Sequence, residues 1–337
     1  MIISRTPFRI SFFGGGTDYP VWYSKNSGAV LAATINKYCY ITCRYLPPFF
    51  EHKSRIIWSK MEYVNDISEI QHASVRACLE FAGINNGVEI HHDGDLPART
   101  GMGSSSAFTV GLLNGLYALK GIMPTKRKLA LDAIHIEQDV LKENVGCQDQ
   151  ALASFGGLNL VEFGGKNHLA VTPVTITPRR SEDFQNHLML FFTGFSRTAS
   201  DIAAEQIKKT PYKKKELNAM LEMVNRALEI LSSGEDLTKF GRLLYDNWQL
   251  KRSLSQKITN LEIDDIYSAA MRAGALGGKL LGAGGGGFML IFAKPKQHSK
   301  IKDKLKKLLH VPFRFEGLGS QIIFYSPGDS TIYDERP

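Results

Sequence analysis

The segment Leu96–Phe108 constrains this chain more than any other, because it joins glycines, serines and the start of a helix. It reads Leu-Pro-Ala-Arg-Thr-Gly-Met-Gly-Ser-Ser-Ser-Ala-Phe, and the apolar run behind it predicts a helix that ends near Gly121. Glycines allow close backbone approach to a ligand, and a helix start adds unpaired N–H donors and the positive end of the dipole. Two interpretations follow: a cradle for nucleotide phosphates, or a glycine turn capped by serine. No Walker motif occurs anywhere in the chain.

Length and composition predict a protein of two domains. The chain has 337 residues, of which 43% are hydrophobic and 22% charged, as in ordinary globular proteins. No apolar run approaches the roughly 20 residues that cross a bilayer, and the first residues lack the pattern of a secretory signal. The four cysteines form neither a CxxC pair nor a zinc spacing. We therefore expect a cytoplasmic protein that has no membrane partner.

The formal net charge of +8 raises the question of a nucleic-acid partner. Many of the lysines lie at positions 208–215 and 294–307, and the segment 301–309 has apolar residues at helical spacing. Its lysines then cover the exposed face of an amphipathic helix, so we expect no nucleic-acid partner. A basic surface that attracts anionic metabolites stays open as an alternative. No sequence feature assigns an oligomeric state.

Strand and helix signals alternate in the first half and predict an α+β protein. Strands are expected over 2–10, 29–43 and 156–162, and an amphipathic helix over 126–141. The polar stretch 178–183 is interpreted as a loop at the domain boundary, which gives domains 1–182 and 183–337. In the second half, strands are expected over 188–193, 288–293 and 321–325, with helices between them and all three strands in one compact layer.

Three further segments carry chemically capable residues. In Pro7–Pro20 a strand meets a glycine triplet and then Asp18, which either binds ligand hydroxyls or only starts a turn. Glu137 falls among apolar neighbours, where a carboxylate needs a cation or a metal, and Asp149 in a glycine-bounded loop suits a general base. Either acid can equally be structural. The run Gly282–Gly287 exceeds the needs of a helix C-cap, which predicts close approach by a phosphate or by another loop.

These segments, in this order, resemble the GHMP kinases, the family of galactokinase, homoserine kinase, mevalonate kinase and phosphomevalonate kinase. Pro97–Ala107 is similar to the family's Pro-x-x-x-Gly-Leu-Gly-Ser-Ser-Ala motif, with Met102 in place of Leu and one extra serine. Lys279–Gly287 is similar to the third motif. The resemblance covers nearly the whole chain. It implies an N-terminal α/β domain like that of a ribosomal protein and a C-terminal ferredoxin-like α+β domain.

The resemblance also implies that ATP and Mg²⁺ are the cofactors. Ser105 would be the magnesium ligand beside Glu137, which precedes Asp149 by the interval seen in galactokinase. The residues expected at the nucleotide are Pro97, Gly101, Met102, Gly103, Ser104, Ser105, Ser106, Gly284 and Gly285.

The remaining implied roles concern phosphoryl transfer and the acceptor. Asp149 would be the base or orienting carboxylate, and Arg9 would neutralise charge near the transferring group. Phosphoryl transfer mainly needs such positioning and electrostatic stabilisation. The residues expected at the acceptor are Asp18, Gly15, Gly16, Gly282 and Arg197.

The glycine triplet also bears on the acceptor. Galactokinase has Gly-Glu-His-Thr-Asp-Tyr where this chain has Gly14–Tyr19, so two sugar-contacting side chains are absent and space for another sugar is expected. The motif is most similar to that of the D-glycero-D-manno-heptose 7-phosphate kinases. A phosphorylated sugar needs a second cation, for which Arg197 is the first candidate and Lys25, Arg99, Arg179 and Arg180 are others. The alternatives are a fucokinase-like or mannose-derivative kinase, and a non-catalytic sensor of ATP and sugar.

Overall fold

The computed structural model describes residues 1–85, 87–165, 168–194 and 199–327. A first sheet of eight strands has the order β12-β1-β2-β5-β3-β4, and β6 and β7 continue it from the other part of β2. Its strands are β1 (Ile2–Phe13), β2 (Gly28–Tyr45), β3 (Ser54–Ile57), β4 (Met61–Val64), β5 (Val88–Gly94), β6 (Leu158–Gly164), β7 (His168–Pro173) and β12 (Gln321–Tyr325).

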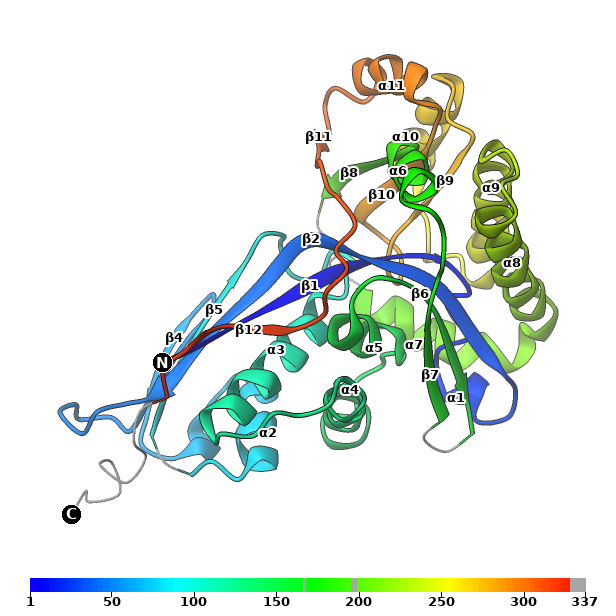
Figure 1. The fold of residues 1–337 in the computed structure, drawn as a ribbon. Coiled ribbons are helices and arrows are strands. Elements are labelled where there is room, and N and C mark those ends of the chain that lie inside the picture. The colour runs from blue at the N-terminus through cyan, green and yellow to red at the C-terminus, as the bar shows by residue number, and fades with distance from the viewer. Residues whose placement is uncertain (86, 166–167, 195–198, 328–337) are drawn as a thin grey trace.

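The long hairpin of β1 and β2 crosses the whole molecule (Figure 1). β2 pairs with β5 through Cys39–Tyr45 and with β6 through Gly28–Ala33, so one strand serves two parts of the sheet. Alternate side chains of β2 point into the core, and Cys39, Ile41 and Cys43 are fully buried. All four cysteines are free and buried, as expected of small core thiols.

Helices cover one face of this sheet. They are α2 (Ala73–Ala82), α3 (Ser104–Leu119), α4 (Lys126–His135) and α5 (Gln148–Phe155), all beneath the strands in Figure 1. Helix α3 is buried on nearly every side from Ser106 to Leu119, as is usual for a helix that is apolar all round. Its close approach to β1 depends on Gly111, where a Cβ would lie 2.8 Å from the Thr6 hydroxyl oxygen. The sheet thus holds the start of α3 at a fixed place.

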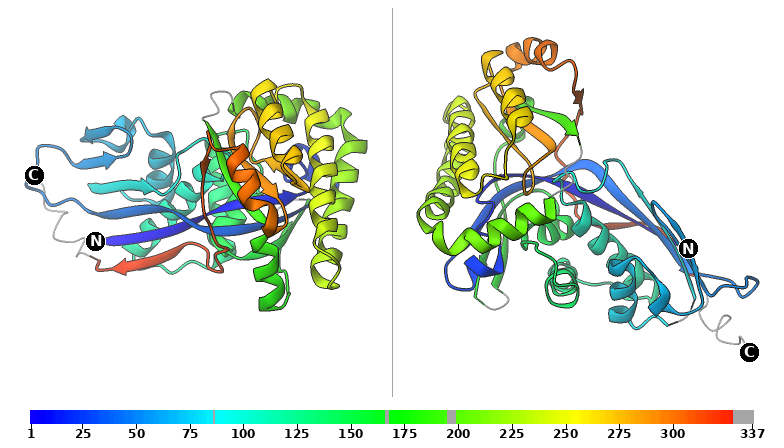
Figure 2. Two further views of the ribbon diagram at one scale, coloured as in Figure 1. Left: turned by 90° about the horizontal axis from the view of Figure 1, so that it is seen from above. Right: turned by 180° about the vertical axis from the view of Figure 1, so that it is seen from behind.

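A second, antiparallel sheet has the order β11-β8-β10-β9. Its strands are β8 (Leu188–Gly194), β9 (Gly277–Leu280), β10 (Gly287–Phe292) and β11 (Leu309–His310), and its helices are α7 (Ala199–Lys209), α8 (Lys214–Ser232), α9 (Thr238–Leu254), α10 (Leu261–Arg272) and α11 (His298–Lys304). Helices α8 and α9 pack beyond the far end of β1 and β2, which Figure 2 shows from above and from behind. There the rings of Phe12, Phe184 and Phe240 contact one another at centroid distances of 4.7–5.8 Å. The two halves therefore share an aromatic core.

The structure confirms the α+β class with two domains and corrects four local expectations. The stretch 178–183 is not a loop but starts α6 (Pro178–Asn186), because Thr177 caps it, Pro178 occupies the first turn and Phe184 is buried. The helix expected over 126–141 ends as α4 and continues as a π-helix over Ile136–Val140. In the lysine-rich segment, α11 ends at Lys304, and Ile301 and Leu305 are buried while the lysines after Ile301 are exposed.

The fourth correction concerns β12, which was expected in the compact layer of the second half. It pairs antiparallel with β1, with Arg5 opposite Gln321, and so belongs to the first sheet. Hydrogen bonding to the free edge of β1 decides its place, and a local pattern does not encode that edge. The interval 183–337 therefore contributes one strand to the other domain. Among the described residues, no helix is both long and apolar enough to span a bilayer.

Candidate active site

A partly buried ion pair joins β1 to the first turn of α5. The Arg9 guanidinium donates from Nε to Asp149 Oδ1 at 2.6 Å and from Nη2 to Asp149 Oδ2 at 2.8 Å. Its third nitrogen donates to the Gly101 carbonyl at 2.6 Å. The side chains are 6% and 23% exposed, so Asp149 keeps an open side. This bidentate pairing fixes the orientation of both side chains.

Asp149 lies on a helix rather than in the loop that the sequence predicted. Helix α5 begins at Gln148, and Asp149 occupies its first turn, where the helix dipole favours a carboxylate. The preceding segment contacts Asp18: the Cys147 N–H donates to the Asp18 carbonyl at 3.1 Å. A Cβ on Gly146 would lie 1.9 Å from Asp18 Oδ2, so only glycine fits there.

Asp18 is a second buried carboxylate at the same place. It is 2% exposed and accepts from the Gly16 N–H at 2.9 Å and from Gln148 Nε2 at 2.8 Å. Burial, with the nearby charge of Asp149, raises the pKa of Asp18 above its ordinary value. Sequence reasoning missed Gln148, although it lies beside Asp149 in the chain. The structure thus brings together Arg9, Asp18 and Asp149, which are far apart in sequence.

The glycine triplet leaves less space than the sequence suggested. A Cβ on Gly14 would lie 1.9 Å from the Ala29 carbonyl oxygen, and one on Gly16 would lie 2.9 Å from Gln206 Nε2 of α7. Only at Gly15 is the neighbourhood open, since the nearest atom is the Ser11 hydroxyl oxygen at 4.0 Å. Of the two positions where side chains are absent, the second half of the chain fills the space at Gly16, and the space at Gly15 stays open.

The glycine-serine loop runs between β5 and α3 and starts that helix without a side-chain cap. Gly101 and Gly103 have φ angles of 78° and 74°, in the region that favours glycine. Helix α3 begins at Ser104 after Gly103, which has no side chain to cap it, and this leaves N–H groups of the first turn for a ligand. Other bonds hold the loop itself: Thr100 Oγ1 donates to the Pro97 carbonyl at 2.7 Å. Met102 is fully buried below it.

Glu137 lies beneath this loop and is fully buried on the π-helix. It accepts from Ser106 Oγ at 2.8 Å and from Gln150 Nε2, both at Oε2. Its Oε1 is buried, and no described residue bonds to it. Burial raises the pKa of Glu137 to about 7. A buried carboxylate oxygen without a partner fits a cation.

The serine that faces Glu137 is Ser106, whereas Ser105 was expected there. Ser105 is exposed and Ser106 is buried. Successive positions of a helix differ by 100°, so a run of three serines turns only one of them toward the interior. Ser105 is thus on the side of the loop that faces solvent.

The glycine run of the second domain packs against this same loop. A Cβ on Gly282 would lie 2.4 Å from Gly101 Cα, and one on Gly287 would lie 2.3 Å from the Thr100 carbonyl oxygen. Gly284 lies against Ile258, where a Cβ would be 2.7 Å from Ile258 Cα. Of the two alternatives from sequence, the structure shows the approach of another loop. The Gly285 N–H donates to the Ile258 carbonyl at 3.0 Å.

Arg180, one of the expected acceptor cations, is bonded to the end of a helix. Arg180 donates from Nη2 to the carbonyls of Ile230 and Glu235 and from Nε to that of Leu231, so it caps the end of α8. Arg197 lies outside the described residues.

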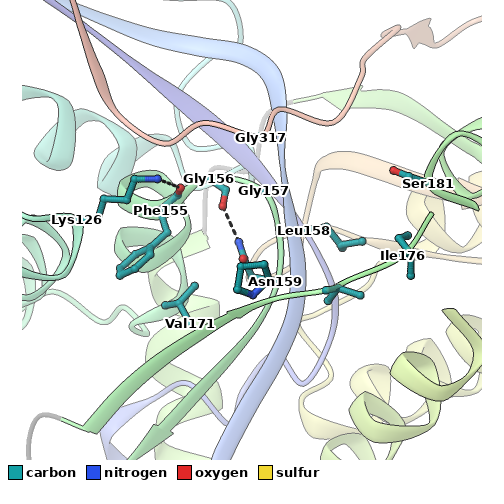
Figure 3. Close-up of a pocket in the computed structure, with 12 residues that line it drawn as sticks. Lys126, Phe155, Gly156, Gly157, Leu158, Asn159, Val171, Ile176, Ser181 and Gly317 are labelled. Atoms are coloured by element: carbon teal, nitrogen blue, oxygen red, sulfur yellow. Dashed lines mark hydrogen bonds between the residues drawn. The ribbon is translucent and has the colours of Figure 1, made fainter. Parts of the chain in front are cut away.

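A cavity of about 350 Å³ opens at the other end of α5 (Figure 3). Lys126 donates to the Phe155 carbonyl at 2.8 Å there, and Asn159 donates to Gly156 at 2.7 Å. Arg9, Asp18 and Asp149 are not among its lining residues, so this cavity is separate from the site.

Comparison with known proteins places this arrangement in a family. The model described as the GHMP kinases N terminal domain matches residues 69–157, and the GHMP kinases C terminal model matches residues 214–311. A relative named D-glycero-alpha-D-manno-heptose 7-phosphate kinase, from Campylobacter jejuni, is 29% identical over 91% of this chain and 93% of its own. A bifunctional fucokinase/GDP-fucose pyrophosphorylase from Arabidopsis thaliana is 25% identical over 89% of this chain and 31% of its own.

Solved structures agree on the fold. A structure described as a D-glycero-D-manno-heptose 1-phosphate kinase from Bacteroides thetaiotaomicron has a TM-score of 0.77, with 22% identity over 97% of this chain and 100% of the other. A putative sugar kinase from Campylobacter jejuni has a TM-score of 0.69, with 27% identity over 96% and 98%.

Fold, site and relatives together define an ATP-dependent phosphotransferase that acts on an alcohol group. The chain belongs to the GHMP kinase family, whose two domain models together match more than half of its length.

Proposed function

We propose that the protein transfers the γ-phosphoryl group of ATP to the anomeric hydroxyl of D-glycero-D-manno-heptose 7-phosphate. The product is the 1,7-bisphosphate, for nucleotide-heptose and surface polysaccharide biosynthesis. The observation that carries this proposal is the similarity to the Campylobacter jejuni heptose 7-phosphate kinase along 91% of this chain and 93% of that one.

The acceptor end of the site supports transfer to a hydroxyl. Arg9 occupies one lone pair on each oxygen of Asp149, which leaves the others for an acceptor hydroxyl. Asp149 orients that hydroxyl or takes its proton, and an anomeric hydroxyl is already relatively acidic. Each carboxylate oxygen of Asp18 likewise accepts one hydrogen bond, so Asp18 can also accept hydrogen bonds from further sugar hydroxyls.

The donor end supports phosphate binding. The uncapped N–H groups of α3 and the loop around Gly101 and Gly103 suit the phosphate oxygens of ATP. Arg9 has five N–H donors and uses three of them on Asp149 and Gly101, so two are left for the transferring group. Such fixed donors stabilise charge that develops in the transition state.

Mg²⁺ is the second cofactor of this proposal. The Oε1 atom of Glu137, which has no partner among the described residues, supports a cation beneath the loop. Ser106 donates to the other oxygen of Glu137, so Ser106 and its chain neighbour Ser105 are the hydroxyls available to such a cation. Protein sites for Mg²⁺ commonly supply one or two carboxylates, with phosphate oxygens and waters as the other ligands. When bound, the ion would neutralise phosphate charge during transfer.

An aromatic cluster beside α3 is the proposed adenine contact. The edge of Trp58 meets His72 at a centroid distance of 4.8 Å, and His72 stacks on Phe108 of α3 at 4.8 Å. Trp58 is held in place because its indole N–H donates to Glu62 at 2.8 Å. Flat rings near the helix that binds the phosphates suit a purine.

A coupled ADP-release assay over a panel of sugars tests the proposal. The panel contains heptose 7-phosphate, free heptose, mannose, fucose and galactose, and a reaction without sugar is the blank. Fastest turnover of the 7-phosphate is expected, with free heptose and mannose poor substrates. Equal turnover of phosphorylated and free sugars contradicts a second anion site. Preference for fucose identifies a fucokinase-like enzyme, and ATP binding without turnover of any sugar identifies a sensor.

A further inference from the structure

Helix α9 of the second domain carries a buried lysine whose ammonium group reaches the seam between the domains. Lys251 is 6% exposed, and its Nζ donates to the carbonyl of Gly282. Gly282 is the residue whose backbone touches Gly101 of the glycine-serine loop. One ammonium group of the second domain therefore holds the segment that backs the phosphate-binding loop of the first.

The charges around Lys251 come from three elements. Arg9 lies on β1, Asp18 follows β1, and Lys279 lies on β9, the strand that α9 packs against. Arg9 is paired with Asp149, so the remaining carboxylate, Asp18, faces two buried lysines. Lys279 is itself bonded to the Phe12 carbonyl at 3.0 Å.

Burying a lysine is expensive unless its charge is compensated. Burial and the charge of Arg9 lower the pKa of Lys251 to about 8, although Asp18 opposes this change. An ammonium group has three N–H donors, and in the structure one of them is bonded, to Gly282. Such a costly group fits a site that is completed by an anion.

We propose that Lys251 is a positioning residue for phosphoryl transfer. It fixes the glycine run of the second domain against the phosphate loop of the first, through Gly282, and it supplies a buried positive charge beside Arg9 and Asp18. This inference rests on the proposed phosphoryl transfer but not on the identity of the acceptor sugar. The residue lies in an ordinary amphipathic helix, so no motif in the sequence pointed to it.

Three variants separate this role from a structural one. Lys251→Met keeps the length of the side chain and removes its charge and bond, Lys251→Arg keeps the charge, and Lys120→Met is the matched control. Lys120 also donates to a backbone carbonyl, that of Ala82 at 2.6 Å, but at the far end of α3. We expect Lys251→Met to lower kcat/KM about 100-fold with only a small loss of Tm, because removal of a desolvated charge offsets much of the lost bond to Gly282. Lys251→Arg should recover activity to within about tenfold of wild type.

The pH dependence of kcat/KM distinguishes this role from a purely structural one, which would leave the pH profile unchanged. Values of kcat/KM report the free enzyme, so in the wild type they should fall as the pH rises through about 8, where Lys251 loses its proton. In Lys251→Arg this alkaline fall should be absent, because guanidinium stays charged. A fall that persists in Lys251→Arg overturns the proposal. So does wild-type activity in Lys251→Met, or a loss of Tm that accounts for its lost activity.

A binding measurement makes the test independent of the sugar. The Kd of a non-hydrolysable ATP analogue with Mg²⁺ is measured by calorimetry at pH 7 and pH 9 for wild type and Lys251→Arg. Weakening of about tenfold in the wild type alone supports the role of Lys251, even if no sugar on the panel is turned over. Equal weakening in both proteins overturns it. Absence of turnover with intact binding counts against the proposed kinase function only.

Discussion

The two glycine-rich segments of this chain look alike in sequence and differ in what their glycines do. In the loop before α3, a Cβ on Gly103 would meet Arg9 and Asp149 at 3.3 Å, so this glycine faces the ion pair of the proposed active site. In the run of the second domain, a Cβ on Gly282 or Gly287 would collide with the backbone of the first domain at 2.4 Å or less. The first segment thus has one glycine against the Arg9–Asp149 pair and another, Gly101, against the second domain, whereas Gly282 and Gly287 both serve backbone contact between the domains. Glycine density alone does not distinguish a ligand cradle from a domain seam.

The largest effect is expected on the catalytic side of this comparison. Asp149→Asn keeps the shape of the side chain but weakens its pairing with Arg9 and its hold on the acceptor hydroxyl. Turnover should fall about 10³-fold, within the usual range for removal of an acid-base group, while the Kd for ATP stays unchanged. Steady-state kinetics and calorimetry measure the two quantities. Near-wild-type turnover would remove Asp149 from this role.

The second prediction concerns the backbone contact between the two domains. It compares Gly282→Ala with Gly121→Ala as the control. Both glycines have positive φ, 76° and 69°, but an added Cβ would strike Gly101 in the first case and meet nothing within 4 Å in the second. Gly121→Ala should cost about 1 kcal/mol in the free energy of unfolding from backbone strain alone. Gly282→Ala should cost about 3 kcal/mol and lower kcat about 100-fold, because the clash also displaces the phosphate loop.

For both glycine variants, chemical denaturation measures the free energy of unfolding, and steady-state kinetics on the same samples measure kcat. Equal losses of stability in the two variants, with kcat preserved in both, would mean that the seam tolerates displacement.

A smaller effect on activity is expected for Glu137, which lies beneath the glycine-serine loop. Glu137→Gln should raise the Mg²⁺ concentration for half-maximal activity about tenfold, since one oxygen ligand is lost. Glu137 titrates near pH 7 when folded and near 4.5 when unfolded, so the unfolded chain loses this proton first as the pH rises. In the absence of Mg²⁺ the wild type should therefore lose about 3 kcal/mol of stability between pH 4.5 and 7 that the variant keeps. Denaturation at a series of pH values measures this difference; parallel pH profiles would contradict it.

The smallest effect on function is expected far from the seam. Arg180→Ala removes three bonds to carbonyls at the end of α8 and should cost about 1–2 kcal/mol of unfolding free energy. The KM for the sugar phosphate should stay within twofold of wild type, because this arginine is committed to the helix end. A large rise in KM would instead give Arg180 a role at the acceptor.

Much of the fold and of the site composition could be predicted from the chain, because the relevant signals are local. Alternation in β1 and β2 and the apolar run after the serines locate their elements, and motif order brings Arg9, Asp18 and Asp149 into one hypothesis. Even α6 had a local signal, since Thr177 followed by Pro178 is a typical helix start. The orientation of side chains and the pairing of distant segments could not be predicted from such local signals. Which of three serines turns inward depends on where α3 begins, and Lys251 gains its meaning only from the loop that it meets.

The pairing of β1 with β12 has a consequence for how the chain reaches its native state. Arg5 and Gln321, which face each other across these strands, are 316 residues apart and also bond through their side chains. During synthesis the N-terminal sheet cannot be completed until the second domain has left the ribosome, so its outer edge stays unpaired for most of translation. Such an edge is a template for wrong pairing between nascent chains. The order in which the ribosome releases the segments therefore sets when the N-terminal domain can close its sheet.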